Sequence, residues 1–297
     1  MQKPKIKRSM LSTVLPGLRS LAKRGLAGWL VIFGAIITGA IVVMTVISPW
    51  ISPHDPSAIN VGPLLSAPSS QFPLGTDLVG RDMLSRVISG GGVMLQVSVF
   101  SVLVCMAIGV PLGLFSSHTG GVLDRFISLI MDSVYAFPGL ILAVAISLFL
   151  GRGVINMALS IAVVYIPSYF RVIRSQVLSI KELPYIEAAN AAGAKKRTVL
   201  SRYILPNVLP SIVVVATVNF ADAILTAAGL TFIGLGVPVN VPDWGWDLTN
   251  GRMLLPSGSW WVIAFPGLMI ILLALGFTLM GEGLSELLNP KLEQGGK

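Results

Sequence analysis

The sequence predicts an all-α membrane protein, a bundle of six transmembrane helices with one helical module outside the membrane. Hydrophobic residues make up 54% of its 297 residues and charged residues only 11%, which is more apolar than a soluble domain of this length. Six runs with few or no charges are each long enough to cross a hydrocarbon core, which takes about 20 apolar helical residues. A polar stretch at residues 181–210, rich in alanine and basic residues, separates two of these runs.

The six predicted spans form one polytopic domain, residues 28–284. A basic N-terminal segment, 1–27, precedes it, and a polar tail, 285–297, follows it. Pro167 interrupts the fourth span, and glycine and proline are tolerated in spanning helices. The spans are Gly28–Trp50, Val93–Phe115, Phe126–Leu150, Val154–Ser175, Ser211–Leu235 and Trp260–Met280.

The distribution of basic residues predicts the topology. Six spans put both termini on one side, together with residues 181–210, and this side carries most of the positive charge behind the net +8. The positive-inside rule then places both termini in the cytoplasm. The chain is predicted to be a multi-pass protein of the cell's inner (cytoplasmic) membrane. We expect residues 1–10 to be disordered and 11–24 to form an interfacial helix on the anionic leaflet.

The first outer loop, residues 51–92, is rich in proline, serine and glycine and is predicted to be irregular as far as Gly75. Thr76 or Asp77 then caps a short helix, on whose exposed side Asp82 and Arg86 are spaced to pair. We interpret this loop as a structural elbow, with a lip that receives substrate as the alternative. Five residues are candidates for the pathway or the outer loops: Asp77, Arg81, Asp82, Trp244 and Trp246.

Three further features of the spans and the last outer loop carry functional alternatives. Prolines interrupt several spans and are either hinges of a conformational cycle or packed kinks: Pro111, Pro138-Gly139 and Pro266-Gly267. Asp132 and Asp222 lie toward the cytoplasmic ends of their spans, where a carboxylate can reach water or a basic residue such as Arg171. We favour anchoring over a proton relay for both acids. The last outer loop has four tryptophans that fit an aromatic belt at the membrane interface: Trp244, Trp246, Trp260 and Trp261. A substrate-facing role for Trp244 or Trp246 is the alternative.

The motifs of several enzyme classes are missing from the sequence. It contains no phosphate loop, no G-x-S-x-G nucleophile motif and no H-E-x-x-H metal motif. Cys105 is the only cysteine, and His54 and His118 are far apart in the sequence. We therefore predict no catalytic, cofactor or metal site. A membrane bundle with one polar module has the layout of a transport subunit powered by a separate protein.

Proline and glycine divide the 181–210 segment into short helices. Pro184 suits a first helical turn, Gly193 a break, and Pro206 the start of the next helix. Alanines at 188, 189, 191, 192 and 194 give helix propensity with little side-chain bulk. The segment is therefore predicted to offer a close-packing surface to a partner. Four of its residues are expected to pack back on the bundle: Val199, Leu200, Tyr203 and Ile204.

This segment resembles the EAA loop of permease subunits in binding-protein-dependent ABC importers. The resemblance lies in Glu187-Ala188-Ala189, in Gly193, and in Leu205-Pro206. Further matches at Leu74-Gly75-Thr76-Asp77, Leu230–Gly236 and Gly281-Glu282-Gly283-Leu284 extend it over roughly residues 20–291. The whole pattern resembles the C-type subunit of the dipeptide/oligopeptide/nickel permease family, with a type I importer fold.

The resemblance implies a set of partners. A second permease subunit would complete the pathway, two ATP-binding subunits would supply the energy, and an extracytoplasmic solute-binding protein would deliver the substrate. The ATPase-coupling residues would be Glu187, Ala188, Ala189, Gly193, Leu205 and Pro206. The family's substrates include dipeptides, oligopeptides, nickel chelates, glutathione and sugars, and the sequence leaves the choice open. A stand-alone secondary transporter or channel is the alternative, and an intramembrane enzyme lacks a supporting constellation.

Overall fold

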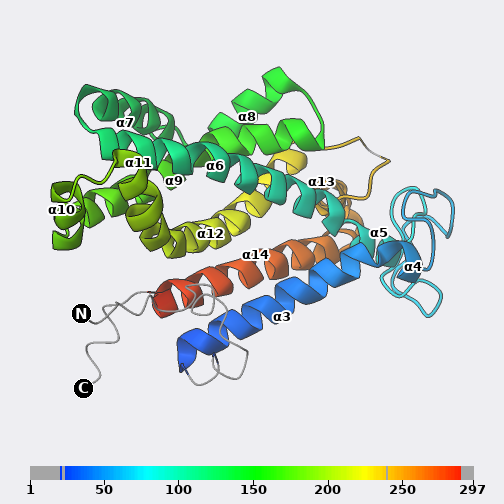
Figure 1. Cartoon of the computed structure of the whole chain (residues 1–297). Coiled ribbons are helices and arrows are strands. Elements are labelled where there is room, and N and C mark those ends of the chain that lie inside the picture. Colours follow the sequence, from blue (N-terminus) through cyan, green and yellow to red (C-terminus); the bar gives the residue numbers. More distant parts are fainter. Residues whose placement is uncertain (1–20, 22–23, 239, 289–297) are drawn as a thin grey trace.

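The computed structural model describes residues 21, 24–238 and 240–288, and these residues are almost entirely helical where they are regular. An isolated bridge between Thr76 and Asp82 is the one β pairing within this part. Figure 1 shows the long helices running roughly side by side, with α10 and α11 at one end and the loop before α5 at the other. The long helices are α3 (Leu26–Val46), α6 (Gly91–Thr119), α9 (Val154–Lys181), α12 (Leu205–Phe232) and α14 (Trp261–Leu288).

Five described helices, in two cases counted together with the short helices that directly precede them, are long and apolar enough to cross a membrane. They correspond to the first, second, fourth, fifth and sixth predicted spans. The fourth runs through Pro167 without a break and continues to Lys181. The short helix α4 (Ser48–Ile51) follows α3 at the end of the first predicted span. The polytopic all-α fold is therefore confirmed.

The third predicted span, Phe126–Leu150, is a bent pair of helices rather than one straight helix. α7 (Gly121–Tyr135) and α8 (Gly139–Leu150) meet at an angle of 92°, and together they count as a possible sixth span. Pro138 is the N-cap of α8 and has no N–H group to continue the ladder of α7. The residue before a proline is also disfavoured in helical geometry, so the helix ends here.

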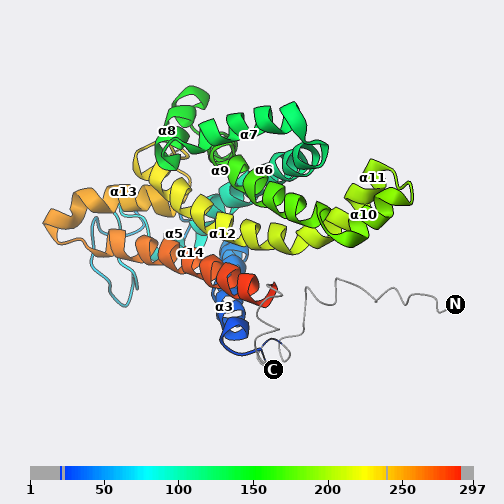
Figure 2. The same cartoon turned by 90° about the vertical axis from the view of Figure 1, so that its left-hand side faces the viewer.

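The helices form two groups around α12. α3 packs along α14, and α6 packs along α9. α12 contacts α14, α6 and α9, and it lies between the two groups in both views (Figures 1 and 2). α8 packs on α9 and α12, whereas α7 contacts α9 and α6.

Glycines let the helices of each group approach closely. A Cβ added at Gly109 of α6 would lie 2.7 Å from the Cβ of Tyr169, and one added at Gly113 would lie 2.9 Å from the Cβ of Ile173. In the other group, a Cβ at Gly34 of α3 would lie 2.5 Å from the carbonyl oxygen of Gly276. These contacts explain how two long helix pairs pack with their backbones close together.

Two large clusters of buried apolar side chains lie along the length of the bundle. One includes Met94, Met157 and Trp244 and lies toward α13 (Trp244–Leu254). The other includes Ile173 and Ile186 and joins α9 to the 181–210 segment. The two ends of the bundle that carry candidate functional residues are thus each built on their own part of the core.

The first loop is irregular up to Gly75, as predicted, and has no helix between α4 and α5 (Met83–Ser89). The predicted cap of α5 is wrong. Asp82, rather than Thr76 or Asp77, is the N-cap, and its carboxylate accepts hydrogen bonds from the N–H groups of Leu84 and Ser85. The interfacial helix predicted at 11–24 lies almost wholly outside the described residues.

Candidate functional site

The 181–210 segment begins with α10 (Pro184–Ala191), one turn after the end of α9. Pro184 occupies the first turn, as predicted. Ile186 is the one residue of α10 whose side chain is fully buried, and it packs with Val199 and Ile204 of the returning chain. Glu187 lies in the first turn, where its charge is favourable to the helix dipole, and it is exposed.

Gly193 ends this helix with a left-handed turn. Its φ is +80°, a conformation that residues with a Cβ adopt only at a cost. The N–H of Gly193 donates to Asn190, and the N–H of Ala194 donates to Ala189, 3.0 Å away. A Cβ at Gly193 would meet no atom within 4 Å, so it is the backbone conformation, and not a lack of space, that favours glycine here. The predicted break is confirmed.

The chain returns to the bundle through α11 (Lys196–Thr198) and one wide turn of π-helix, Val199–Ile204, that leads into α12. Pro206 stands in the first turn of α12, as predicted, and its ring clashes with a carbonyl four residues earlier in ordinary α geometry. The wider turn relieves this clash. Val199 and Ile204 are fully buried and Leu200 packs against the same cluster, as expected, whereas Tyr203 is 37% exposed and lies outside that cluster.

The outward face of this segment is polar and basic, and the side chains at its centre are small. Ala188 and Ala192 are exposed and add almost no side-chain height, and Ala189 is half-buried. Lys195, Lys196, Arg197 and Arg202 are exposed around them. Within the described chain, α10 contacts α9 and the π turn, and its outer side is uncovered. The geometry therefore provides a short, smooth helix that another protein can approach closely.

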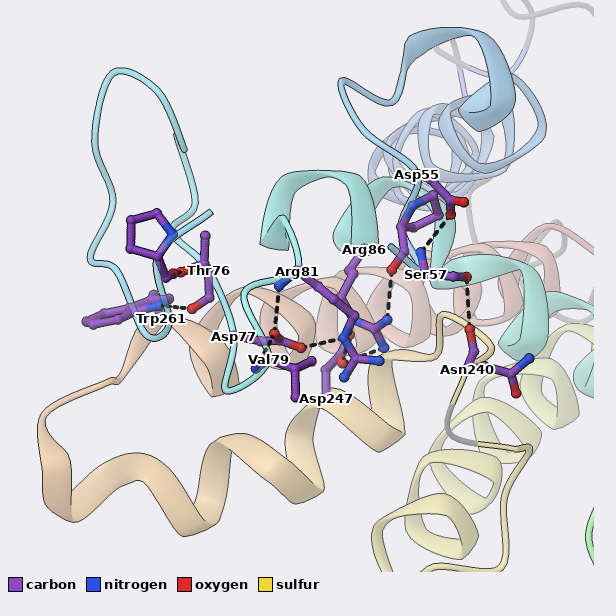
Figure 3. Close-up of polar contacts among 12 residues, drawn as sticks. Asp55, Ser57, Thr76, Asp77, Val79, Arg81, Arg86, Asn240, Asp247 and Trp261 are labelled. Atoms are coloured by element: carbon purple, nitrogen blue, oxygen red, sulfur yellow. Dashed lines mark hydrogen bonds and ion pairs between the residues drawn. The ribbon is translucent and has the colours of Figure 1, made fainter. Parts of the chain in front are cut away.

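A second group of polar residues lies at the opposite end, in the first loop (Figure 3). Asp77 organises a tight turn: its Oδ1 accepts hydrogen bonds from the N–H groups of Val79 and Arg81, and its Oδ2 accepts one from Nε of Arg81 at 2.6 Å. Both side chains are buried. Thr76 accepts a hydrogen bond at its carbonyl from the indole of Trp261, which fixes the loop to α14.

Arg86 is fully buried, and its pairing differs from the prediction. Its Nη2 lies 2.7 Å from Oδ1 of Asp247 on α13, and its Nη1 donates to the carbonyl of Pro56 (Figure 3). The predicted exposed pair with Asp82 is wrong, because Asp82 is 1% exposed and accepts hydrogen bonds from Ser85 in capping α5. The i,i+4 spacing favoured the pair with Asp82, and a partner 161 residues away gave no local signal.

The aromatic-belt interpretation of Trp244 is also wrong. Trp244 is fully buried in the main core cluster, and its indole donates to the carbonyl of Val87 at 2.8 Å. Trp246 is half-buried on the same helix. Among the four tryptophans of the last outer loop, Trp260 suits an interface, because its side chain is 52% exposed. The packing of Trp244 explains why Gly90 and Gly91 have no room for a Cβ beside it.

Asp243 precedes α13 and is strongly affected by its surroundings. Its Oδ1 accepts the N–H of Gly245, and its side chain is fully buried. Burial, followed by the neighbouring carboxylate of Asp247, raises the pKa of Asp243 to about 7. The sequence indicated acids near Arg81 and Arg86 in the outer loops but gave no sign that this one is withdrawn from solvent.

The two acids of the spans lie in different settings. Asp132 of α7 pairs with Arg171 of α9 at 2.7 Å, the partner that the sequence suggested. Asp222 of α12 is half-buried and forms no ion pair within the described residues. A stronger contact between α7 and α9, from Arg174 to Asp124, was not predicted.

Comparison with known proteins places this architecture in a family. The family described as "Binding-protein-dependent transport system inner membrane component" matches residues 109–294. A dipeptide transport system permease protein of Alkalihalophilus pseudofirmus is 38% identical over 264 residues, which cover 89% of this chain and 86% of that protein. A probable D,D-dipeptide transport system permease protein of Escherichia coli is 40% identical over 268 residues, covering 90% and 89%.

A glutathione transport system permease protein of Pectobacterium atrosepticum is 41% identical over 233 residues, covering 77% of this chain and 76% of that protein. The matched region includes the 181–210 segment, α13 and α14. The chain therefore belongs to the family of inner membrane components of binding-protein-dependent transport systems and is a permease subunit.

Proposed function

We propose that this permease subunit belongs to an ATP-driven importer of short peptides or closely related small solutes. A second permease subunit completes the pathway with it, two ATP-binding subunits power it, and an extracytoplasmic solute-binding protein delivers the solute. Relatives named for dipeptide, D,D-dipeptide and glutathione transport support this substrate class. ATP hydrolysis is assigned to the separate subunits, because the sequence contains no phosphate loop.

The single observation that carries the proposed coupling is the uncovered helix α10 with its glycine turn. In this proposal α10 sits in a groove of one ATP-binding subunit. Ala188 and Ala189 allow the two backbones to come close, and Glu187 meets a basic group of that subunit. Gly193 makes the turn, and Leu205 and Pro206 start the helix that carries the displacement into the bundle.

The proposal places both termini and the 181–210 segment in the cytoplasm. The exposed basic residues of this segment support that orientation, since cytoplasmic loops are enriched in lysine and arginine. The first loop and α13 then face the opposite side, where a solute-binding protein docks. The separation of the two groups to opposite ends of the bundle supports the assignment of different partners to each (Figure 1).

At the outer end, we assign a bracing role to four of the five candidate residues. Asp77, Arg81, Asp82 and Trp244 are all buried and bound to neighbouring parts of the chain. They hold the loop in shape for a docking partner instead of touching solute. Trp246 is half-buried and is the candidate of the five that suits contact with a partner or solute.

The test is purification of the tagged chain from native membranes under mild conditions, followed by mass spectrometry. We expect a second permease, ATP-binding subunits and a solute-binding protein to co-purify, and the chain alone to hydrolyse no ATP. A chain that purifies alone, and that transports solute in proteoliposomes without ATP, would show a secondary carrier instead.

A further inference from the structure

Helix α7 buries very little of its side-chain surface against α6 and α9, the helices that it contacts. Asp124 is the one residue of α7 with a buried side chain, although the helix is 15 residues long. Its neighbour α8, by contrast, packs on α9 and α12 and contributes Ala143 to the main core cluster. A hollow of about 590 Å³, lined in part by Ser128 and Asp132, opens along α7.

Both ends of α7 are built to bend. Gly120 caps the helix and Gly121 begins it; each has φ +69°, and a Cβ at either would meet nothing within 4 Å. At its other end the chain turns by 92° before α8 begins at Gly139. Neither connection carries packing that would hold α7 at a fixed angle.

Two arginines of α9 hold α7 in place. Arg174 forms a fork with Asp124: Nε donates to Oδ1 at 2.9 Å, and Nη2 donates to Oδ2 at 2.7 Å. Arg171, three residues earlier on the same face of α9, donates to Oδ1 of Asp132 and lies 4.0 Å from the ring centre of Tyr135. A bidentate arginine fixes orientation as well as distance.

The same helix continues into the 181–210 segment. α9 ends at Lys181, and α10 begins three residues later. Val177 and Ile180, on the last turns of α9, are buried in one cluster with Ile186 and Val199. A displacement of α10 therefore acts directly on the end of α9 that carries Arg174 and Arg171.

We propose that Arg171 and Arg174 are positioning residues of transport: they make α7 follow α9, so that movement of the 181–210 segment reaches the bent pair α7–α8. This inference rests on the proposed function, because it takes the 181–210 segment as the point where the ATP-binding subunits act. α8 stays packed in the core, and the bend between α7 and α8 changes its angle as α7 moves.

The test measures distances between spin labels in the complete transporter, purified with its partner subunits, without nucleotide and with ATP plus vanadate. One pair joins Leu129→Cys on α7 to Leu268→Cys on α14, both at exposed positions, and buried Cys105 is left in place. A second pair joins Leu129→Cys to Ser179→Cys, an exposed position on α9.

In the wild-type background we expect the α7–α14 distance to shift with nucleotide and the α7–α9 distance to stay constant. In Arg171→Gln/Arg174→Gln the α7–α14 shift is lost, and the α7–α9 distribution broadens. Arg174→Asp is expected to behave in the same way, and Asp124→Arg/Arg174→Asp to restore the shift. Arg125→Gln, an exposed position on α7 without an ion pair in the described chain, serves as the charge control.

Two further measurements, assembly of the complex and its rate of ATP hydrolysis, distinguish a loss of positioning from a loss of folding. We expect both to be kept in the double glutamine variant. A full α7–α14 shift in that variant overturns the inference alone, and loss of assembly in it shows a merely structural role, which also overturns it. A wild-type complex whose distances and solute uptake are indifferent to ATP overturns the proposed function and, with it, this inference.

Discussion

Arg86 and Asp247 form an ion pair of 2.7 Å, fully buried on both sides, that ties the helix of the first loop to the helix before the last span. Burying two charges is costly, and breaking such a pair leaves one of them without a counter-ion. The hydrogen bond from Arg86 to the carbonyl of Pro56 brings a third segment to the same point. The pair is therefore the junction on which the shape of this end depends.

Removing one partner of this junction should be strongly destabilising. We expect Asp247→Asn to lower the free energy of unfolding by about 3–5 kcal/mol, because it leaves the guanidinium of Arg86 buried without an opposite charge. Thermal unfolding of the purified protein in detergent measures the loss. The control is Asp132→Asn, which removes an exposed pair and should cost about 1 kcal/mol or less. Equal losses in the two variants would contradict this account of Arg86.

Asp243 should make stability depend on pH. Its pKa is about 7 in the folded protein and near 3.8 when exposed, so folding keeps a proton that the unfolded chain releases. The contribution of Asp243 to the free energy of unfolding therefore falls as pH rises from about 4 to 7 and is constant above pH 7. Each tenfold difference in proton affinity between the two states corresponds to about 1.4 kcal/mol.

Asp243→Asn isolates this effect, since an amide oxygen can still accept the N–H of Gly245 and carries no charge. We expect the variant and the wild type to have similar melting temperatures near pH 4, and the variant to be the more stable of the two near pH 8. A constant difference in melting temperature across this range would show that Asp243 does not titrate there.

Gly193→Val should uncouple the ATP-binding subunits while the chain still inserts into the membrane. The left-handed conformation costs a residue with a Cβ about 1–2 kcal/mol, more for a β-branched one, so the end of α10 is displaced. ATP-dependent uptake and co-purification of the ATP-binding subunits are the measurements. Gly193→Asn is the matched control, because asparagine tolerates this conformation and there is open space for its side chain. Normal uptake and docking in the valine variant would contradict a coupling turn.

The glycine contacts between α6 and α9 should be intolerant of a single methyl group. We expect Gly109→Ala to destabilise the protein, because the new Cβ lies 2.7 Å from that of Tyr169 and 2.9 Å from the carbonyl oxygen of Ile166. Gly39→Ala in α3 has nothing within 4 Å and should instead stabilise by up to about 1 kcal/mol through helix propensity. Melting temperatures that move in the same direction for both variants would contradict the packing described for α6 and α9.

The proposed orientation can be tested with single cysteines, since Cys105 is buried. Ala67→Cys in the first loop and Ala192→Cys after α10 are both at exposed positions. We expect a membrane-impermeant maleimide to label Ala67→Cys in intact spheroplasts, and Ala192→Cys only after the membrane is opened. Labelling of Ala192→Cys in intact spheroplasts would show that the orientation is the reverse of the one proposed.

Hydropathy and turn residues were enough to predict most of the fold. The long apolar runs gave the spans, and the positions of Pro184, Gly193 and Pro206 in the 181–210 segment are confirmed because each acts through its own backbone. Features that depend on distant partners were missed. Pro138-Gly139 indicated a hinge or a kink, but an apolar run does not record the direction of its axis, so the size of the bend between α7 and α8 was not predicted.

The errors at the loop end have the same physical cause. Arg86 could pair with Asp82 by local spacing, yet the structure uses Asp82 as a cap and gives Arg86 a partner on α13. Trp244 lies in a segment whose composition resembles an interfacial belt. Its ring is nevertheless buried in the core, where Gly90 and Gly91 leave space for it, and the sequence gives no sign of this contact. The coupling residues are a prediction that awaits a complex with partner subunits.

The pairing of Arg86 with Asp247 also sets an order of events during synthesis. The two residues are 161 positions apart, so at a translation rate of about 5–20 residues per second Arg86 is made roughly 8–30 s before its partner. Trp261, which holds Thr76, is made later still. The first loop therefore acquires its final shape only when the last helices have been delivered to the bilayer, and truncated chains would be expected to leave this arginine available to quality-control proteases.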